Sequence, residues 1–531
     1  MTTKTSSSTS WWKNAVIYQI YPRSFKDSNN DGIGDLQGII QQADYLSSLN
    51  VDAVWISPFF KSPMKDFGYD VADYRDVDPM FGKTEDFKQL LDVFHKRGIK
   101  IIIDMVLNHS SDQHAWFSES RQNKKNEKSN WYVWADAKPD GSPPNNWLSV
   151  FGGSAWSWDP RRAQYYLHNF LTEQPDLNVR NPEVQKALLA DCKFWLDLGV
   201  DGFRLDVCNF YIHDEKLRDN PPSEKAVKFI EGVPSNNPYN MQSHDFDICQ
   251  IENYDFLKKL RALTDEFKDR ILIAEIFNDG NRDLIRNYIE PLGPLHTAYS
   301  FSFLVDQFPH EALKLSLEKL TSGTTPFWAF GNHDVPRVNS RFAPEFGGAE
   351  FSKQIFSFLS VVGAGFFLYQ GDELGLPQAE IPFEKIQDPY GKNFYPIFKG
   401  RDGCRTPIPW DESANSGFNL SFEPWLPIPT DHKSLAADSQ DKNPSSLLNL
   451  VRRMFSERKN IQGVLTELKV KDGLISFKRD TYSCYYNFTP EVSVFSLHSM
   501  DALPTFSHHY HLENNQLTLK PYGSFVGRSL T

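Results

Sequence analysis

Two carboxylates lie where apolar stretches end: Asp206 follows GFRL, and Glu275 lies within ILIAEIF. A pair of carboxyls can hydrolyse a glycoside when one acts as nucleophile or base and the other, as an acid, protonates the leaving oxygen. Arg204 precedes Asp206 by two residues, so on a strand both would point the same way, and the cation would keep Asp206 ionised. Partial desolvation of Glu275 behind ILIA would raise its pKa towards the working range of an acid. By itself the pattern fits many enzymes that have acidic strand ends.

A second oxygen-rich stretch, DSNNDGIGD at residues 27–35, places Asp or Asn at nearly every second position. This spacing matches the first half of an EF-hand loop, in which alternating side-chain oxygens converge on Ca²⁺ and a Gly permits a sharp bend. The match ends at position twelve of the loop, where an EF-hand needs a bidentate Glu and this chain has Gly38. The residues alone therefore leave two alternatives, a cation loop of another kind and a polar turn.

The elements that must position the two carboxylates form a repeating pattern. Longer segments such as LQGIIQQADYLSSL, with apolar residues at i, i+3 and i+4, indicate amphipathic helices. Eight short apolar runs alternate with such segments, at residues 15–22, 51–58, 99–106, 200–207, 271–277, 296–304, 325–334 and 364–373. Eight strand–helix repeats predict an α/β fold, a (β/α)₈ TIM barrel, with catalytic groups at the C-terminal ends of its strands. Polar clusters follow the runs at those ends, among them Asp104 to His109 and Asn332-His333-Asp334.

Long interruptions and a change of pattern predict the domain organisation. Residues 109–171 are too long for a connection and predict an inserted domain B after the third strand, and residues 210–250 predict a loop excursion after the fourth. From residue 456 short alternating runs without helical periodicity predict a C-terminal antiparallel β-sandwich domain. We therefore expect a first part of the barrel at 1–108, the remainder at 172–455 and the β domain at 456–531, behind a disordered Ser/Thr-rich tail.

Composition limits the partners and the compartment. The net charge of the 531 residues is -12, which argues against nucleic-acid binding, because that needs a basic surface. Five scattered Cys without a C-x-x-C pair predict reduced thiols and no zinc site, and the histidines of HHYH (508–511) are expected to be surface or core residues. The polar N-terminus and the lack of a long apolar run predict a cytoplasmic protein that does not bind membranes.

Taken together, the motifs resemble glycoside hydrolase family 13, the α-amylase family, and within it the α-glucosidase and oligo-1,6-glucosidase branch. They spread over residues 15–410 and read AVIYQIYPRSF, NNDGIGDLQGI, GYDVADY, DMVLNHSS, GVDGFRLDV, AEIF, GNHDVPR and RDGCRTPIPW. The resemblance implies the nucleophile at Asp206, the general acid/base at Glu275 and a third catalytic carboxylate, Asp334, that binds the sugar 2- and 3-hydroxyls. It further implies that Asp66 and Arg401 close the far end of the pocket.

The resemblance also implies the remaining site residues. Substrate binding falls to Asp66, Tyr69, His109, Phe170, Gln174, Arg204, His333 and Arg401. For the opening loop it implies a structural Ca²⁺ or Mg²⁺ held by Asp27, Asn29, Asp31, the Ile33 carbonyl and Asp35, with no organic cofactor. From the residues themselves, Asp104 has two readings, a structural anchor for Arg204 or a substrate contact.

The expected activity is that of a retaining exo-acting α-glucosidase, which releases glucose from the non-reducing ends of short α-glucosides and can transfer glucosyl groups. The alternatives are a sucrose-acting transglucosylase or isomerase and a strict oligo-1,6-glucosidase. A non-catalytic relative is disfavoured because the carboxylate set is complete. The expected partners are small α-glucosides or oligosaccharides, with the protein a monomer or a homodimer. Val207, directly after the nucleophile, favours α-1,6 bonds in the branch, whereas CNFYIHDEKLRDNPP favours α-1,4 bonds and small aglycones.

Overall fold

Eight parallel strands form the barrel that the sequence predicts. The computed structural model describes residues 10–223, 233–234, 236–277, 284–321, 326–342, 348–420, 422–497 and 502–529. Each predicted run contains one strand: β1 (Val16–Ile20), β2 (Ala53–Ile56), β5 (Lys100–Met105), β9 (Gly202–Leu205), β10 (Ile271–Ile276), β11 (Thr297–Ser300), β12 (Trp328–Ala329) and β13 (Phe366–Tyr369). The strands neighbour one another in chain order, and β13 returns to pair with β1. The amide of Phe327 donates to the carbonyl of Ala298, which links the β12 side to β11 and nearly closes the barrel.

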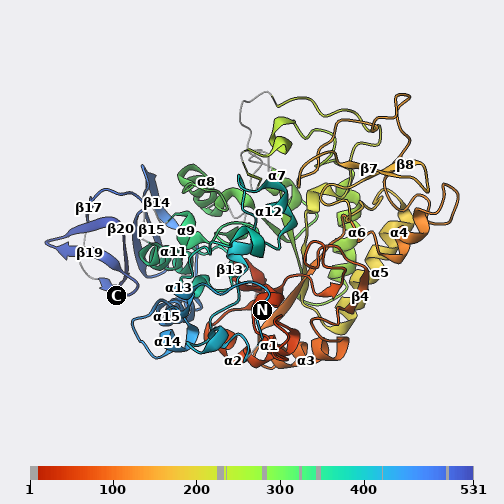
Figure 1. The fold of residues 1–531 in the computed structure, drawn as a ribbon. Coiled ribbons are helices and arrows are strands. Elements are labelled where there is room, and N and C mark those ends of the chain that lie inside the picture. Colours follow the sequence, from red (N-terminus) through yellow and green to blue (C-terminus); the bar gives the residue numbers. More distant parts are fainter. Residues whose placement is uncertain are drawn as a thin grey trace, which may run out of the picture.

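Helices follow the strands and surround the barrel (Figure 1). α5 shows how the sequence sets their ends, because Asn181 caps its first turn, Pro182 occupies the first helical position and Gly199 ends it with φ 111°. The predicted helix at 36–49 is two short helices that meet at Gln42. The main helices are α1 (Leu36–Gln41), α2 (Ala43–Ser48), α3 (Thr84–His95), α5 (Pro182–Leu198), α6 (Asn253–Asp265), α7 (Leu284–Tyr288), α8 (His310–Thr321), α11 (Ala349–Val362) and α15 (Leu447–Arg458).

Successive side chains of a barrel strand point alternately outwards to the helices and inwards to the barrel axis. This alternation produces two hydrophobic cores and determines the direction of the catalytic side chains. On β10, Leu272, Ala274 and Ile276 pack with the helices, whereas Ile271 and Ile273 belong to the second core, inside the barrel. Glu275 continues the second series with a period of two, so its side chain is directed inwards at the C-terminal end of the strand. The fold thus delivers this carboxylate to the barrel axis without help from a loop.

The long connection after β5 carries its own small sheet. An antiparallel sheet, β6 (Trp134–Ala135), β8 (Gln164–Leu167) and β7 (Trp156–Asp159), stands beyond helix α4 (Ala115–Ser120). Its return to the barrel pairs His109 with Asp176 and Tyr132 with Leu177. In the excursion after β9, the helical turn η4 (Pro238–Met241) is described, while 224–232 and 235 lie outside the described residues. Residues 1–9, expected to be a disordered tail, also lie outside them.

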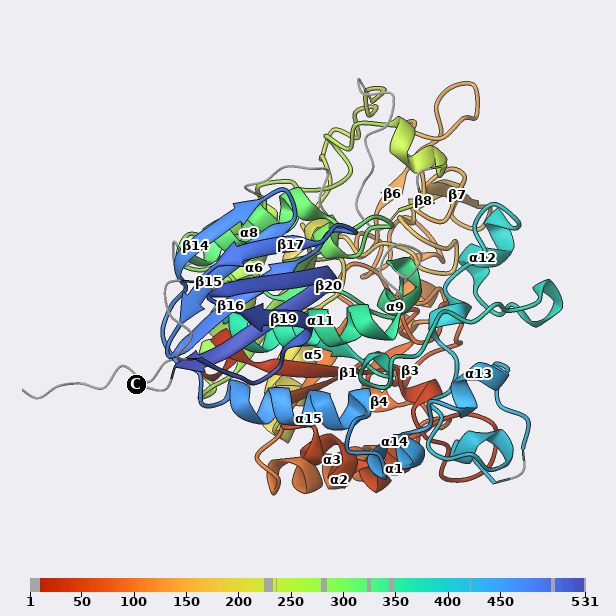
Figure 2. The ribbon, with the colours of Figure 1, turned by 90° about the vertical axis from the view of Figure 1, so that its left-hand side faces the viewer.

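The C-terminal residues form an antiparallel sheet against the barrel helices. Its strands are β14 (Thr466–Lys471), β15 (Leu474–Arg479), β16 (Tyr482–Asn487), β17 (Ser493–Ser496), β18 (Ala502–Pro504), β19 (His508–Glu513) and β20 (Gln516–Ser529). The long β20 pairs with β16 through one part of its length and with β17 and β19 through another. Figure 2 shows this sheet lying across α11, the contact used below. Within the described part of the chain, no helix has the length and apolar character that a membrane span requires.

Candidate active site

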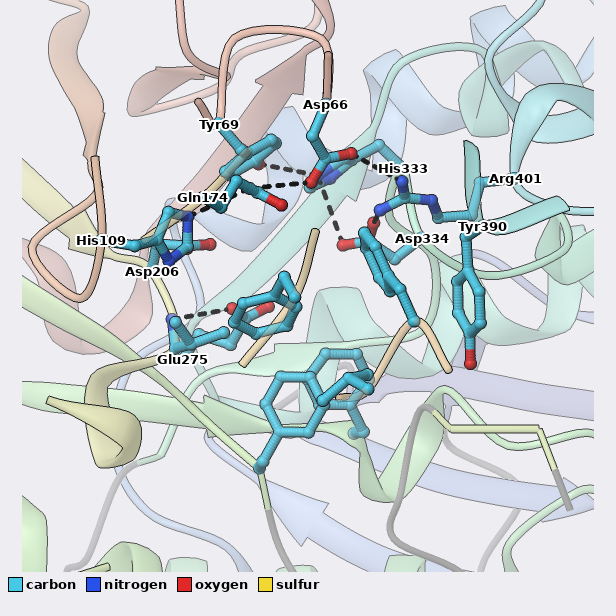
Figure 3. Close-up of a pocket in the computed structure, with 16 residues that line it drawn as sticks. Asp66, Tyr69, His109, Gln174, Asp206, Glu275, His333, Asp334, Tyr390 and Arg401 are labelled. Carbon is cyan, nitrogen blue, oxygen red and sulfur yellow. Dashed lines mark hydrogen bonds and ion pairs between the residues drawn. The ribbon is translucent and has the colours of Figure 1, made fainter. Parts of the chain in front are cut away.

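A pocket with about 590 Å³ of space opens at the C-terminal ends of the barrel strands. Figure 3 shows its labelled carboxylates and histidines gathered around one space, with Tyr390 to one side beside Arg401. Asp66 and Tyr69 come from the loop between β3 (Phe60–Lys61) and β4 (Asp73–Val77), and Phe170 and Gln174 from the end of the inserted region. All the predicted catalytic and substrate-binding residues except Arg204 line it: Asp66, Tyr69, His109, Phe170, Gln174, Asp206, Glu275, His333, Asp334 and Arg401.

Arg204 lies beneath the pocket and joins the two central carboxylates. Its Nη1 donates to Asp206 Oδ1 at 2.5 Å, and its Nη2 pairs with Glu275 Oε1. Glu275 Oε2 also accepts the backbone N–H of Val207, the residue after Asp206, at 3.1 Å. All three charged side chains are buried. One guanidinium therefore holds both carboxyl groups close together at the pocket floor.

Burial controls the titration of this pair. Burial raises the pKa of the Asp206 carboxyl to about 7, against the lowering influence of Arg204. Burial likewise raises the pKa of the Glu275 carboxyl to about 7, with Arg204 again opposing it. Each carboxylate repels the other charge, so the two groups lose their protons as a pair rather than independently. Near neutral pH the pair can hold one proton and one negative charge, which is the state that acid-assisted nucleophilic attack requires.

Asp104 contacts Arg204 and does not line the pocket. Its Oδ1 accepts Arg204 Nη1 at 2.9 Å, and its Oδ2 accepts the hydroxyl of Tyr69 at 3.0 Å. Trp55 Nε1 donates to the same oxygen at 3.3 Å. Of the two readings that the sequence left open, the geometry supports the structural one, since these contacts fix the guanidinium under the pocket.

A chain of hydrogen bonds fixes the proton of His333. Gln19 Nε2 lies 2.7 Å from its Nδ1, so that nitrogen accepts and Nε2 carries the proton. His333 Nε2 then donates to the hydroxyl of Tyr69 at 2.7 Å, and this hydroxyl donates onward to Asp104. Burial lowers the pKa of His333 well below its usual value, so the ring stays neutral.

Asp334 is held ionised by two arginines. Arg405 Nη2 donates to its Oδ1 at 3.0 Å, and Arg401 Nη1 donates to the same oxygen at 3.2 Å. Burial alone would raise the pKa of Asp334, but the neighbouring charges of Arg401 and Arg405 hold it well below its usual value. A permanent carboxylate here can accept hydrogen bonds from two neighbouring hydroxyls of a sugar.

One wall of the pocket is formed by a charged network. Arg401 Nη2 donates to Asp66 Oδ1 and to Asp388 Oδ1, both at 2.8 Å. Gln174 Nε2 donates to Asp66 Oδ2 at 3.2 Å and lies 3.1 Å from His109 Nε2. Burial lowers the pKa of His109 to about 3, so it enters this network as a neutral ring. Asp66 and Arg401 thus form a buried, charged part of the pocket wall.

Several pocket residues were missed by sequence reasoning. Asp388, which clamps Arg401, and Tyr390, which lines the pocket, come from α12 (Pro389–Phe394) and its cap, in a connection without strand or helix periodicity. The ring of Tyr390 stacks on that of Phe151, with 4.6 Å between the ring centroids. Asn237 Nδ2 donates to the hydroxyl of Tyr390 at 2.8 Å and to the carbonyl of Val150 at 2.7 Å. The inserted region, the excursion after β9 and the connection after β13 thus meet around Tyr390, and no local sequence pattern predicts that contact.

Val207 has a left-handed backbone, φ 37° and ψ 49°, which a β-branched residue rarely adopts. This conformation turns the Val207 N–H towards Glu275 Oε2 and leaves the buried side chain at the pocket wall. Strain of this kind persists only where the surroundings enforce it, and it clusters at functional sites. The residue after Asp206 therefore contacts Glu275 and also lines the pocket.

The loop at 27–35 forms a series of tight side-chain turns. Asp27 Oδ2 accepts the amides of Gly32 at 2.8 Å and of the Asn419 side chain at 2.8 Å. Asn29 and Asp31 each accept the amide two residues ahead. Gly38 donates to Asp35 Oδ1 at 2.7 Å, and a Cβ on Gly38 would lie 1.9 Å from the carbonyl oxygen of Lys26, so only glycine fits. The loop thus presents hard oxygen donors of the kind that Ca²⁺ and Mg²⁺ prefer, but its three carboxylates do not all come within 4.8 Å of one another.

Comparison with known proteins places this site in context. The family described as "Alpha amylase, catalytic domain" matches residues 19–467. A "Probable alpha-glucosidase" of Rhizobium meliloti (strain 1021) is 46% identical over 536 residues, which cover 98% of this chain and 97% of that protein. An "Oligo-1,6-glucosidase" of Parageobacillus thermoglucosidasius is 37% identical over 488 residues, covering 85% of this chain and 84% of the relative.

A solved structure agrees over the whole chain. The crystal structure of an alpha-glucosyl transfer enzyme, XgtA, superposes with a TM-score of 0.93 at 44% identity. The match covers 98% of this chain and 100% of that one. The barrel, the inserted region and the C-terminal sheet are therefore shared as one arrangement.

Proposed function

Because the chain belongs to the α-amylase family, glycoside hydrolase family 13, and is a glycoside hydrolase, we propose that it is a retaining, exo-acting α-glucosidase. Its substrates are short α-glucosides and oligosaccharides, from whose non-reducing ends it releases glucose. Transfer of the glucosyl group to another alcohol is a second outcome of the same chemistry, and the name of XgtA, an alpha-glucosyl transfer enzyme, favours including it.

One observation carries this proposal: two carboxyls share one guanidinium at the floor of a pocket. The joint contact of Asp206 and Glu275 with Arg204 keeps them near each other. Retaining glycosidases hold their carboxyls about 5–5.5 Å apart, whereas inverting enzymes leave about 6.5–9.5 Å for a water. The Asp66–Arg401 pair in the pocket wall supports exo action, since in this proposal it closes the pocket around a terminal sugar.

The proposed reaction has two displacements. Asp206 attacks the anomeric carbon and forms a β-glucosyl ester, while Glu275 gives its proton to the leaving glycosidic oxygen. Glu275, now ionised, takes a proton from water or an acceptor alcohol, whose oxygen displaces Asp206 and restores the α configuration. Asp334 holds the sugar hydroxyls, and Arg204 stabilises the charge that shifts between the two carboxyls.

Product analysis on maltose, isomaltose and sucrose tests the proposal. We expect glucose from all three, with sugars of new linkage at high substrate concentration. Conversion of sucrose chiefly into an isomeric disaccharide would instead support the sucrose-acting alternative. Products from the interior of long glucans, without free glucose, would contradict exo action.

Linkage preference depends on the wall next to Asp206, where Val207 lies. A methyl or two at such a wall changes discrimination by about 1–3 kcal/mol. We therefore expect activity on both linkages, with maltose a good substrate, and a shift of the maltose to isomaltose ratio of kcat/KM on Val207→Thr. A wild-type enzyme more than about a hundredfold selective for isomaltose, on the same energy scale, would contradict this expectation. An unchanged ratio in the variant would remove Val207 as a determinant.

We also propose that the loop at 27–35 holds a structural Ca²⁺ or Mg²⁺ through Asp27, Asn29, Asp31, the Ile33 carbonyl and Asp35. Contacts from Phe418, Asn419 and Trp425 attach this loop to a distant part of the chain, so an ion there would stabilise that junction. The ion supplies positive charge to a loop rich in carboxylates and takes no part in bond cleavage.

Removal of this ion should lower the melting temperature more than the initial rate. Calorimetry and rate assays before and after chelation measure both effects. Asp31→Ala should lower the melting temperature and abolish its response to Ca²⁺ or Mg²⁺, because it deletes an exposed ligand. Immediate loss of activity on chelation at an unchanged melting temperature would point to a catalytic metal instead.

A cytoplasmic location remains part of the proposal. It accords with the buried thiols of Cys192, Cys208, Cys404 and Cys484, whose pKa values burial raises. Such thiols are unreactive packing groups, as expected for Cys208 beside the catalytic pair.

A further inference from the structure

A cluster of metal-ligating side chains lies far from the pocket, where the C-terminal sheet meets α11. One ligand atom from each of Glu350, His508 and His509 falls within 4.8 Å of the others. Glu350 belongs to the first turn of α11, and the two histidines begin β19. No other group of three His, Cys, Asp or Glu side chains in the described ranges is that close.

The backbone of β19 is distorted where it presents these histidines. Neighbouring residues on a regular strand point to opposite faces, so His508 and His509 could not both reach Glu350. Here the register with β20 shifts between His508 and Tyr510, and His509 has φ 51°. A β-bulge changes the direction in which a side chain points. The left-handed backbone conformation of His509 is uncommon for residues other than glycine. The distortion brings both imidazoles to the same side.

Neighbouring residues contact the side chains of Glu350 and His508 and fix their orientation. Ser524 Oγ lies 2.9 Å from His508 Nδ1 and fixes that ring, as outer partners do for metal-bound histidines. Lys353 Nζ pairs with Glu350 Oε1 at 2.6 Å, while Glu350 Oε2 lies 3.5 Å from His509 Nε2. His509 is 43% exposed, which leaves a side open to solvent.

We propose that Glu350, His508 and His509 bind a Zn²⁺ ion that joins the C-terminal sheet to the barrel. Two imidazoles and one carboxylate form a borderline donor set, which suits Zn²⁺ and not Ca²⁺ or Mg²⁺. Ligand atoms of a tetrahedral zinc site lie about 3.4 Å apart, given bonds of about 2.0–2.1 Å, so small side-chain rotations complete the site. Water occupies the fourth position. The site departs from the expectation, based on the cysteines, that the chain lacks zinc, and from that of unliganded histidines in HHYH.

Zinc binding to the full chain tests this proposal directly. After chelation and removal of the chelator, ZnCl₂ titration by calorimetry should show one tight equivalent, and CoCl₂ should give the visible absorption of a low-coordinate site. Zinc should raise the melting temperature, because the ion connects two parts that separate on unfolding. The turnover of a glucoside should not change.

Variants distinguish this site from adventitious binding to surface histidines. His509→Ala and Glu350→Gln should each weaken zinc binding at least tenfold and remove the thermal shift. His511→Ala is the matched control, since His511 is an exposed histidine of the same strand, paired with Glu513. Asp31→Ala should leave zinc binding intact.

Equal binding by wild type and His509→Ala, or no binding at 100 equivalents of zinc, would overturn the proposal and leave a plain His509–Glu350 ion pair. Both His509 and Glu350 are partly exposed, so these variants are expected to fold. None of these outcomes bears on the proposed glucosidase activity, because no pocket residue is involved.

Discussion

Replacing Asp206 by Asn should lower kcat by about 10⁴-fold or more, since catalytic residues that act as a unit cannot substitute for one another. Asn keeps the shape of the side chain but cannot form the glucosyl ester. Replacing Glu275 by Gln removes proton transfer, which contributes about 10²–10⁴-fold. The two variants should differ on an aryl glucoside with an acidic leaving group. Glu275→Gln should still release the aryl alcohol in a burst, because that departure needs no proton, whereas Asp206→Asn should not.

Asp201→Asn is a suitable control for these variants. Asp201 lies at the opposite end of β9 and is buried among Lys100, Arg270 and His95. Its loss should lower the melting temperature while kcat stays near the wild-type value. Comparable losses of kcat in Asp201→Asn and Asp206→Asn would show that destabilisation, not chemistry, explains the effect.

Replacing Arg204 by Gln should damage both stability and catalysis. Arg204 is buried against Asp104, Asp206 and Glu275, and breaking a buried ion pair from one side costs about 3–5 kcal/mol of the free energy of unfolding. Loss of one preorganised electrostatic group at a reacting centre typically lowers kcat by about 10²–10³-fold. Arg204→Lys should recover part of both, because it keeps a charge but cannot reach all three carboxylates.

The pH dependence of kcat/KM distinguishes an electrostatic role of Arg204 from a purely structural one, which would leave the pH profile unchanged. Activity needs one ionised and one protonated carboxyl, so kcat/KM should fall as pH rises through about 7, where the pair loses its last proton. It should also fall in acid, where Asp206 becomes protonated. Arg204 lowers the pKa of Asp206, so its removal should move the acidic limb to higher pH. Arg218→Gln is the matched control, because the exposed Arg218 pairs with Asp214 and does not line the pocket, so its loss should change neither limb.

The barrel and the catalytic floor could be predicted because local sequence encodes them. Parallel strands buried on both faces read as continuous apolar runs, and a period of two places Glu275 behind Ile271 and Ile273. The same logic pairs Arg204 with Asp206. The roles of Asp66, His109 and Asp334 came instead from the family resemblance, since spacing alone does not show which loop residues converge.

The part of the pocket around Tyr390 could not be predicted, because loops that are distant in the sequence form it. Asp388 and Tyr390 reach the pocket through contacts with Arg401, Phe151 and Asn237, across separations that no local pattern records. The left-handed backbone of Val207 could not be predicted either, because β-branched residues rarely adopt that conformation. The sequence therefore did not predict those residues whose position or backbone conformation depends on tertiary packing.

The anomeric form of the first glucose released from an aryl α-glucoside, which yields a single glucose, tests the retaining mechanism most directly. Two displacements at one carbon, the first by Asp206, must return the starting configuration. Proton NMR of a fresh reaction should therefore show α-glucose first, with β-glucose appearing only at the rate of mutarotation. If β-glucose forms first, a water attacks directly, and the assignment of Asp206 as a nucleophile is wrong.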